Sequence, residues 1–213
     1  STGQRQLCRG QGAELVWQQN PAPLKSVEVL DIFRKKTAPA FEVALHLGAI
    51  YAGEEQHEEV SEVLAAYSEN LGIAYQIRDD LSDLGAEGET NDLASLRPSL
   101  LLAIGHERAK DEQKEILTSV WRRQLPENVT FADIETMYTQ LKAIDRADTL
   151  LATYKEEAVR SLRELENASL KGLLRRVVGK IFNETVVKGW CSEAQNLSEL
   201  DKVRGQNGDT IAA

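Results

Sequence analysis

The sequence predicts an all-α protein. Its 213 residues are rich in Leu, Ala, Glu, Lys and Arg, and they include only 14 glycines and five prolines. This mixture favours helices. Apolar residues recur at spacings of three and four, and no alternating pattern typical of strands is sustained. We therefore expect helices along nearly the whole chain.

Each predicted helix is bounded by a proline, a glycine or a polar loop. The predicted helices cover residues 5–19, 27–34, 38–52, 60–84, 98–106, 109–123, 131–142, 144–167 and 170–189. Pro21 and Pro23 end the first helix. Thr37 is the expected N-cap of the third helix, with Pro39 in its first turn. Because the third helix is apolar almost all round, we expect it to be a buried central helix, closed by Gly53.

Composition and charge predict a single helical domain over residues 1–197, which is part of a larger fold. Hydrophobic residues make up 42% of the chain and charged residues 28%, as is usual for globular proteins. The 34 acidic and 25 basic side chains give a net charge of −9, which argues against a nucleic-acid partner. No apolar run is long enough for a membrane span. Residues 198–213 are polar, and we expect them to form a frayed tail.

The cysteines and the start of the chain carry little functional information. Cys8 and Cys191 form neither a disulfide framework nor a metal motif, so we expect reduced thiols in the cytoplasm. The chain begins Ser1-Thr2-Gly3, without a methionine or the sections of a signal peptide. We therefore expect that this is not the native start.

A cluster of aspartates carries the main chemical signal. Residues 79–83 read DDLSD and lie within the predicted helix 60–84. Because a helix advances about 100° per residue, Asp79, Asp80 and Asp83 share an arc of roughly 100° with Gln76. Clustered carboxylates repel one another, and Mg²⁺ prefers oxygen ligands and often bridges carboxylates to phosphates. The motif alone leaves open the alternative of a solvated acidic helix face.

Three motifs follow one another along the chain. Residues 10–15 read GQGAEL, residues 36–53 contain KTA, Phe41, LGA and AG, and residues 71–83 read LGIAYQIRDDLSD. Together they resemble the GQxxDL, KTAxLF…LGAxxAG and LGxAFQxxDDxxD motifs of the trans-isoprenyl diphosphate synthase (polyprenyl synthetase) family. Glu14 stands in place of Asp, and Tyr75 in place of Phe. The resemblance covers residues 8–182.

The resemblance implies the C-terminal half of an isoprenoid-synthase-type helical bundle around a central cavity. It implies a Mg²⁺-dependent transferase that condenses isopentenyl diphosphate with an allylic isoprenoid diphosphate and releases diphosphate. By the same resemblance, the metal ligands would be Asp79, Asp80 and Asp83, and the catalytic residues would be Lys36, Thr37 and Gln76. The substrate-binding residues would be Gln11, Lys36, Thr37, Tyr75, Gln76 and Arg97.

The chain departs from the family pattern in two places. The family has an earlier aspartate-rich motif, so we expect an upstream N-terminal half as a partner, and a homodimer as is usual in the family. Residues 92–99 read DLASLRPS and lack the Gly-Lys of the family's DLxxGKxTLP. Arg97 is either a substitute cation for phosphate or a surface residue before a helix. Two alternatives therefore stay open: a non-catalytic subunit of a heteromeric prenyl synthase, and a class I terpene synthase relative.

Overall fold

The structure is a computed structural model that describes residues 2–51, 57–84 and 97–183. These ranges contain helices and no strand, which confirms the predicted all-α class. The helices are α1 (Thr2–Gln19), α2 (Ser26–Tyr51), α3 (His57–Ser82), α5 (Leu100–Arg108), α6 (Asp111–Trp121), α7 (Phe131–Gln140), α8 (Ala143–Ser161), the 3₁₀ turn η1 (Leu162–Glu164) and α9 (Ala168–Ile181). None of these helices is long and apolar enough to cross a membrane.

The chain divides into two compact units, Ser1–Leu165 and Glu166–Ala213. The predicted single domain of residues 1–197 runs across this division. In the second unit, α9 begins at the N-cap Asn167, whose side-chain oxygen accepts from the Leu170 N–H at 3.0 Å. Three predicted features lie outside the described residues: the C-cap Gly53, the loop at residues 85–91 and the tail at residues 198–213.

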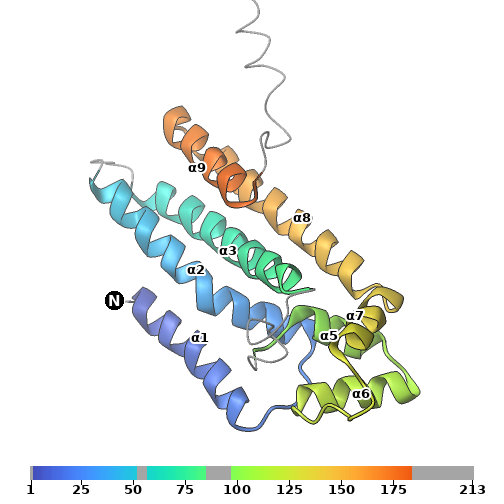
Figure 1. Cartoon of the computed structure of the whole chain (residues 1–213). Helices are drawn as coiled ribbons and strands as arrows, with labels where there is room; N and C mark the ends of the chain where they lie inside the picture. Colours follow the sequence, from blue (N-terminus) through green and yellow to red (C-terminus); the bar gives the residue numbers. More distant parts are fainter. Residues whose placement is uncertain (1, 52–56, 85–96, 184–213) are drawn as a thin grey trace, which may run out of the picture. The chain divides into compact units, whose positions relative to one another are not determined.

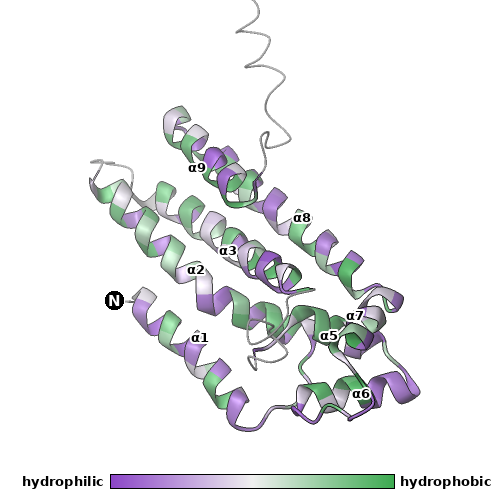
Figure 2. Cartoon of the chain, viewed as in Figure 1, coloured by the Kyte–Doolittle hydropathy of each residue, from purple (hydrophilic) through white to green (hydrophobic). Residues whose placement is uncertain are grey.

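In the first unit, α1, α2, α3 and α8 lie side by side in that order, and α5, α6 and α7 gather near the C-terminal end of α3 (Figure 1). The core is centred on α5, which is hydrophobic over most of its length (Figure 2). Its residues 100–105 are all buried, and Leu117, Trp121 and Ile134 from α6 and α7 join the same cluster. The edge of the cluster reaches α1, where the ring of Trp17 meets that of Trp121 edge-on at 5.5 Å.

The prediction of two separate helices around Thr37 was wrong. A single helix, α2, runs from Ser26 to Tyr51, so Thr37 lies within it and is not an N-cap. Pro39 is an interior residue of this helix and cannot donate to the carbonyl of Lys35, four residues earlier. The backbone of Gly10 in α1 lies directly against that carbonyl. The Lys35 carbonyl therefore lacks its usual helical N–H donor at the point where α1 crosses α2.

The prediction of a fully buried helix over residues 38–52 was also wrong in part. Ala38, Pro39 and Ala49 are buried, but the opposite side of α2 is exposed. Its exposed apolar residues are Val43, Leu47, Ile50 and Tyr51, of which Leu47 is 62% exposed and Tyr51 95% exposed. All-round apolarity indicates how much of a helix can be buried, and it does not specify which segment covers each side.

Two glycines bring the backbones of α1 and α3 close to α2. A methyl group added at Gly10 would lie 2.6 Å from the Lys35 carbonyl carbon and 2.8 Å from the Lys36 nitrogen. A methyl group added at Gly72 in α3 would lie 2.8 Å from the Ala38 nitrogen. All three distances are shorter than a van der Waals contact. The three helices therefore approach backbone to backbone around residues 35–38 of α2.

An ion pair joins α1 to α2 beside this crossing. Lys36 Nζ lies 2.8 Å from Oε2 of Glu14, whose side chain is only 8% exposed. Gly10 and Glu14 are four residues apart, so they share the face of α1 that meets α2. A buried carboxylate is costly unless it is paired. The pair therefore couples the position of Lys36 to the packing of α1.

The close approach of α3 to α2 predicts a position-specific cost of replacing glycine. We expect Gly72→Ala to lower the free energy of unfolding by about 1–3 kcal/mol, because backbone atoms must shift to admit the methyl group. Gly48→Ala in α2 is the matched control, since nothing lies within 4 Å of its added methyl group. It should instead stabilise the helix by about 0.5–1 kcal/mol. Urea unfolding of both variants measures the difference, and equal stability would contradict the crossing described here.

The ion pair predicts a measurable coupling between its partners. Lys36→Met should destabilise the chain by about 1–3 kcal/mol, because the Glu14 carboxylate stays buried without this cation. The double variant Glu14→Gln/Lys36→Met should be destabilised by about 1–2 kcal/mol less than the sum of the costs of the two single variants. Urea unfolding of the four proteins of this cycle gives the coupling.

The exposed pair Arg160 and Glu156 on α8, at 2.7 Å, is the control for this cycle. Glu156→Gln should lower the free energy of unfolding by no more than about 0.5 kcal/mol, as is usual for exposed pairs spaced i,i+4. Strict additivity at Glu14 and Lys36 would show that the two side chains do not interact.

Candidate functional site

A pocket of about 360 Å³ opens between α2, the C-terminal end of α3 and the segment before α5. Its lining carries both signs of charge. The lining residues are Glu14, Ile32, Phe33, Lys36, Gln76, Asp79, Ser82, Asp83, Arg97 and Pro98. Carboxylates and cations so close together can hold a ligand that is itself anionic and bound through a divalent metal.

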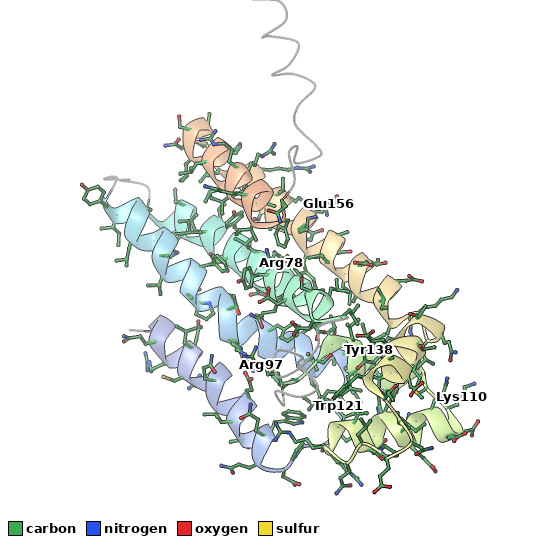
Figure 3. All side chains as sticks on the ribbon, in the orientation of Figure 1. Arg78, Arg97, Lys110, Trp121, Tyr138 and Glu156 are labelled. Carbon is green, nitrogen blue, oxygen red and sulfur yellow. The ribbon has the colours of Figure 1, made fainter. Side chains whose placement is uncertain are left out.

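The pocket brings together five of the residues that the sequence predicted as functional. They come from separate parts of the chain and are Lys36, Gln76, Asp79, Asp83 and Arg97. Gln76, Asp79 and Asp83 share one face of α3 because they are three and four residues apart. Arg97, in the segment before α5, lies beside α2 (Figure 3) and lines the same pocket as the two aspartates.

Four other predicted site residues, Gln11, Thr37, Tyr75 and the buried Asp80, do not line this pocket. Gln11 is exposed on α1, and Thr37 is half-buried within α2. Tyr75 packs edge-on against Phe41 of α2, with ring centroids 6.3 Å apart. The Arg78 guanidinium lies 4.6 Å from the centre of the Tyr75 ring. Tyr75 thus joins α2 to α3 in the described structure.

The aspartates of the motif have different surroundings. The side chain of Asp79 is 46% exposed, and its Oδ1 accepts from Nη2 of Arg78 at 3.1 Å. Asp83 is half-buried and lines the pocket. Asp80 is 4% exposed and does not line the pocket. The three carboxylates therefore do not share one environment.

Asp80 is directed into the core, at the start of α5. Its Oδ2 accepts from the Leu101 N–H at 3.0 Å. The neighbouring amide, that of Leu102, donates to Oγ of the N-cap Ser99 at 3.2 Å. Burial, and secondly the negative charge of Asp80, raise the pKa of Tyr138 well above its usual value. The Asp80 carboxylate is thus close enough to the α7 side of the core to influence Tyr138.

Sequence reasoning missed Glu14 as a site residue. It occupies the acidic position of the GQxxDL-like motif, but it was noted only as a departure from that pattern. In the structure it lines the pocket and pairs with Lys36. Its spacing of four from Gly10, the residue at which α1 touches α2, is the signal that could have placed it there.

The donors of the pocket suit a hard divalent cation that a ligand helps to hold. Within the described residues, no group of three His, Cys, Asp or Glu side chains is arranged to hold a metal ion alone. Asp79 and Asp83 supply carboxylate oxygens, which Mg²⁺ prefers, and Mg²⁺ is commonly bound by one or two carboxylates together with substrate phosphates. The residues present therefore fit Mg²⁺ shared with a phosphate-bearing ligand.

Comparison with known proteins identifies relatives with a consistent description. The family model described as polyprenyl synthetase matches residues 1–141. A geranylgeranyl diphosphate synthase from Sulfolobus acidocaldarius is 26% identical over 172 residues, which cover 76% of this chain and 50% of that protein. The farnesyl diphosphate synthase of Escherichia coli is 33% identical over 84 residues, which cover 39% of this chain and 27% of that protein.

Solved structures of similar fold carry related descriptions. A decaprenyl diphosphate synthase from Rhodobacter capsulatus superposes with a TM-score of 0.72 at 21% identity, covering 87% of this chain and 58% of that one. A polyprenyl synthase from Caulobacter crescentus, complexed with calcium and isoprenyl diphosphate, gives 0.66 at 25% identity, covering 84% of this chain and 56% of that one.

The chain spans about half the length of the first of these curated relatives. The family match nevertheless extends from the first residue through α1, α2 and α3 into α7, and it includes every residue that lines the pocket. The resemblance carried by the three sequence motifs is thereby confirmed. The chain belongs to the polyprenyl synthetase family, and its fold is the all-α fold of that family.

Proposed function

We propose that this chain supplies the C-terminal half of a Mg²⁺-dependent prenyltransferase. The enzyme joins isopentenyl diphosphate to an allylic isoprenoid diphosphate and releases diphosphate. The pocket carries the proposal, because Asp79 and Asp83 share it with the cations Lys36 and Arg97. A reaction that breaks an allylic carbon–oxygen bond needs its positive charges where the departing diphosphate collects negative charge.

Each pocket residue has a role that follows from its chemistry. Lys36 and Arg97 contact phosphate oxygens, and the guanidinium of Arg97 can do so through two N–H groups. Gln76 adds a neutral amide to the lining, and its oxygen can stabilise positive charge on a nearby carbocation. Ile32 and Phe33 give the lining an apolar part, which suits a hydrocarbon chain.

Asp79 and Asp83 are the proposed Mg²⁺ ligands among the described residues. Held there together with substrate phosphates, Mg²⁺ would supply positive charge against the leaving diphosphate. Glu14 acts indirectly, because its contact with Lys36 fixes where that ammonium group lies. The roles predicted for Gln11, Thr37 and Tyr75 require substrate contacts outside this pocket.

The proposed enzyme needs more protein than this chain. An upstream half that carries the first aspartate-rich motif would complete the cavity. The names of the relatives, geranylgeranyl and farnesyl diphosphate synthases, support isoprenoid diphosphates as the substrate class. The homodimer stays a prediction from the sequence resemblance, and the cytoplasmic location stays a prediction from the cysteines.

The proposal predicts how activity depends on the two carboxylates that line the pocket. In the chain expressed with its upstream half, Asp79→Asn and Asp83→Asn should each lower kcat/KM about a hundredfold or more, as loss of a preorganised charge does. Asp148→Asn, an identical change at an exposed position of α8, is the control and should leave the rate unchanged. Incorporation of labelled isopentenyl diphosphate into product, with Mg²⁺ and with EDTA, is the measurement.

Three other results would count against the proposal. No product from the complete protein at any Mg²⁺ concentration would favour the non-catalytic subunit, for which the missing Gly-Lys in residues 92–99 already argues. Products formed from an allylic diphosphate alone would favour a terpene synthase, since cyclisation does not consume isopentenyl diphosphate. Equal activity with EDTA would exclude dependence on Mg²⁺.

A further inference from the structure

The middle aspartate of the DDxxD motif has a different environment from the outer pair. Asp79 and Asp83 line the pocket, whereas Asp80 is 4% exposed and lies outside the lining. Helix geometry explains the difference. Asp83 is turned by about 40° from Asp79, but Asp80 is turned by about 100°, toward the side of α3 that carries the fully buried Ile77.

The buried carboxylate meets a need of α5. The first amides of a helix have no partner within the helix, and here two successive amides are satisfied by side chains. The Leu101 N–H donates to Asp80 Oδ2 at 3.0 Å, and the Leu102 N–H donates to Ser99 Oγ at 3.2 Å. The N-terminus of a helix also attracts negative charge. A carboxylate at this position is therefore stabilised without any metal ion.

The Asp80–Leu101 bond connects α3 to α5, and the residues that line the pocket include neighbours of both bonded residues. Asp80 adjoins Asp79 in α3, and Leu101 follows four residues after Arg97. Pro98 and Ser99, the residues between Arg97 and the helix, are buried, and Pro98 also lines the pocket. A shift of α5 along α3 would thus move Arg97 relative to Asp79 and Asp83.

We infer that Asp80 is a positioning residue that holds Arg97 in register with Asp79 and Asp83, and that it is not a Mg²⁺ ligand. The inference rests on the proposed function for the roles of Arg97 and the metal. It divides the motif into an outer pair that binds Mg²⁺ and a middle residue that fixes α5. Asp80 then contributes to diphosphate affinity only through Arg97.

Substitutions that keep or remove the acceptor oxygen test this assignment. Asp80→Asn retains an oxygen that can accept from Leu101, whereas Asp80→Ala removes it. In the chain expressed with its upstream half, Asp80→Asn should change Mg²⁺ affinity less than about threefold, because the ligands are untouched. Asp79→Asn and Asp83→Asn should weaken it about tenfold or more. Calorimetric titration of Mg²⁺ in the presence of inorganic diphosphate measures these affinities without catalytic turnover.

A second set of variants separates positioning from stability alone. Asp80→Ala should lower Tm by about 2–4 °C, as loss of one helix cap does in a protein of this size, and Ser99→Ala is the matched control for a lost cap. Asp80→Ala should also weaken inorganic diphosphate binding about as much as Arg97→Ala does. The double variant Asp80→Ala/Arg97→Ala should be no weaker than Arg97→Ala, because both changes remove the same contact.

Three outcomes would overturn the inference. One is an Asp80→Asn protein that loses Mg²⁺ affinity as Asp79→Asn does. Another is additive loss of diphosphate affinity in the double variant, and a third is an Asp80→Ala protein with unchanged Tm. If Asp80→Ala does not fold, the Asp80→Asn titration still decides the metal assignment. Failure of the unmodified protein to make prenyl products would count against the proposed function only, since Tm and the titrations do not depend on turnover.

Discussion

The arrangement of the site depends on the close approach of three helix backbones. Gly10 and Gly72 let α1 and α3 touch α2 around residues 35–38, where no side chain separates the helices. Because main-chain contacts set the distance between these helices, the side chains beside the crossing are held in fixed positions relative to one another. Lys36 lies at this point, and it lines a pocket with residues of both neighbouring helices. The same backbone contact therefore packs the three helices together and positions Lys36 in the pocket.

The short aspartate motif combines two kinds of requirement. Its outer carboxylates line the pocket, while its middle carboxylate is buried and accepts a hydrogen bond from the main chain of α5. A helix satisfies both requirements because adjacent residues point about 100° apart. Clustering in the sequence consequently does not place all three side chains in the same pocket. The number of acidic residues in such a motif is an upper limit on its ligands.

The sequence was sufficient for the fold class and for much of the site, because both depend on periodic patterns. Helical spacing placed Gln76, Asp79, Asp80 and Asp83 on one face, and the pocket has all of them except Asp80, which is buried. Local rules failed at Pro39, which usually marks a helix boundary but here lies inside α2, where another helix covers the interrupted turn. The environment of Asp80 could not be predicted, since it depends on α5, whose position is set by long-range packing.

The edge-on contact of Trp17 with Trp121 gives the molecule an optical property. Two indole rings held 5.5 Å apart at 81° form a fixed asymmetric pair of chromophores, and Trp121 is 1% exposed. Such ordered aromatic packing produces a near-ultraviolet circular dichroism signal, which is lost when tertiary packing loosens even if helices persist. Since Trp17 belongs to α1 and Trp121 to α6, the signal reports whether α1 is packed against α6. The spectrum can thus follow the helix that carries Gly10 and Glu14 independently of overall helix content.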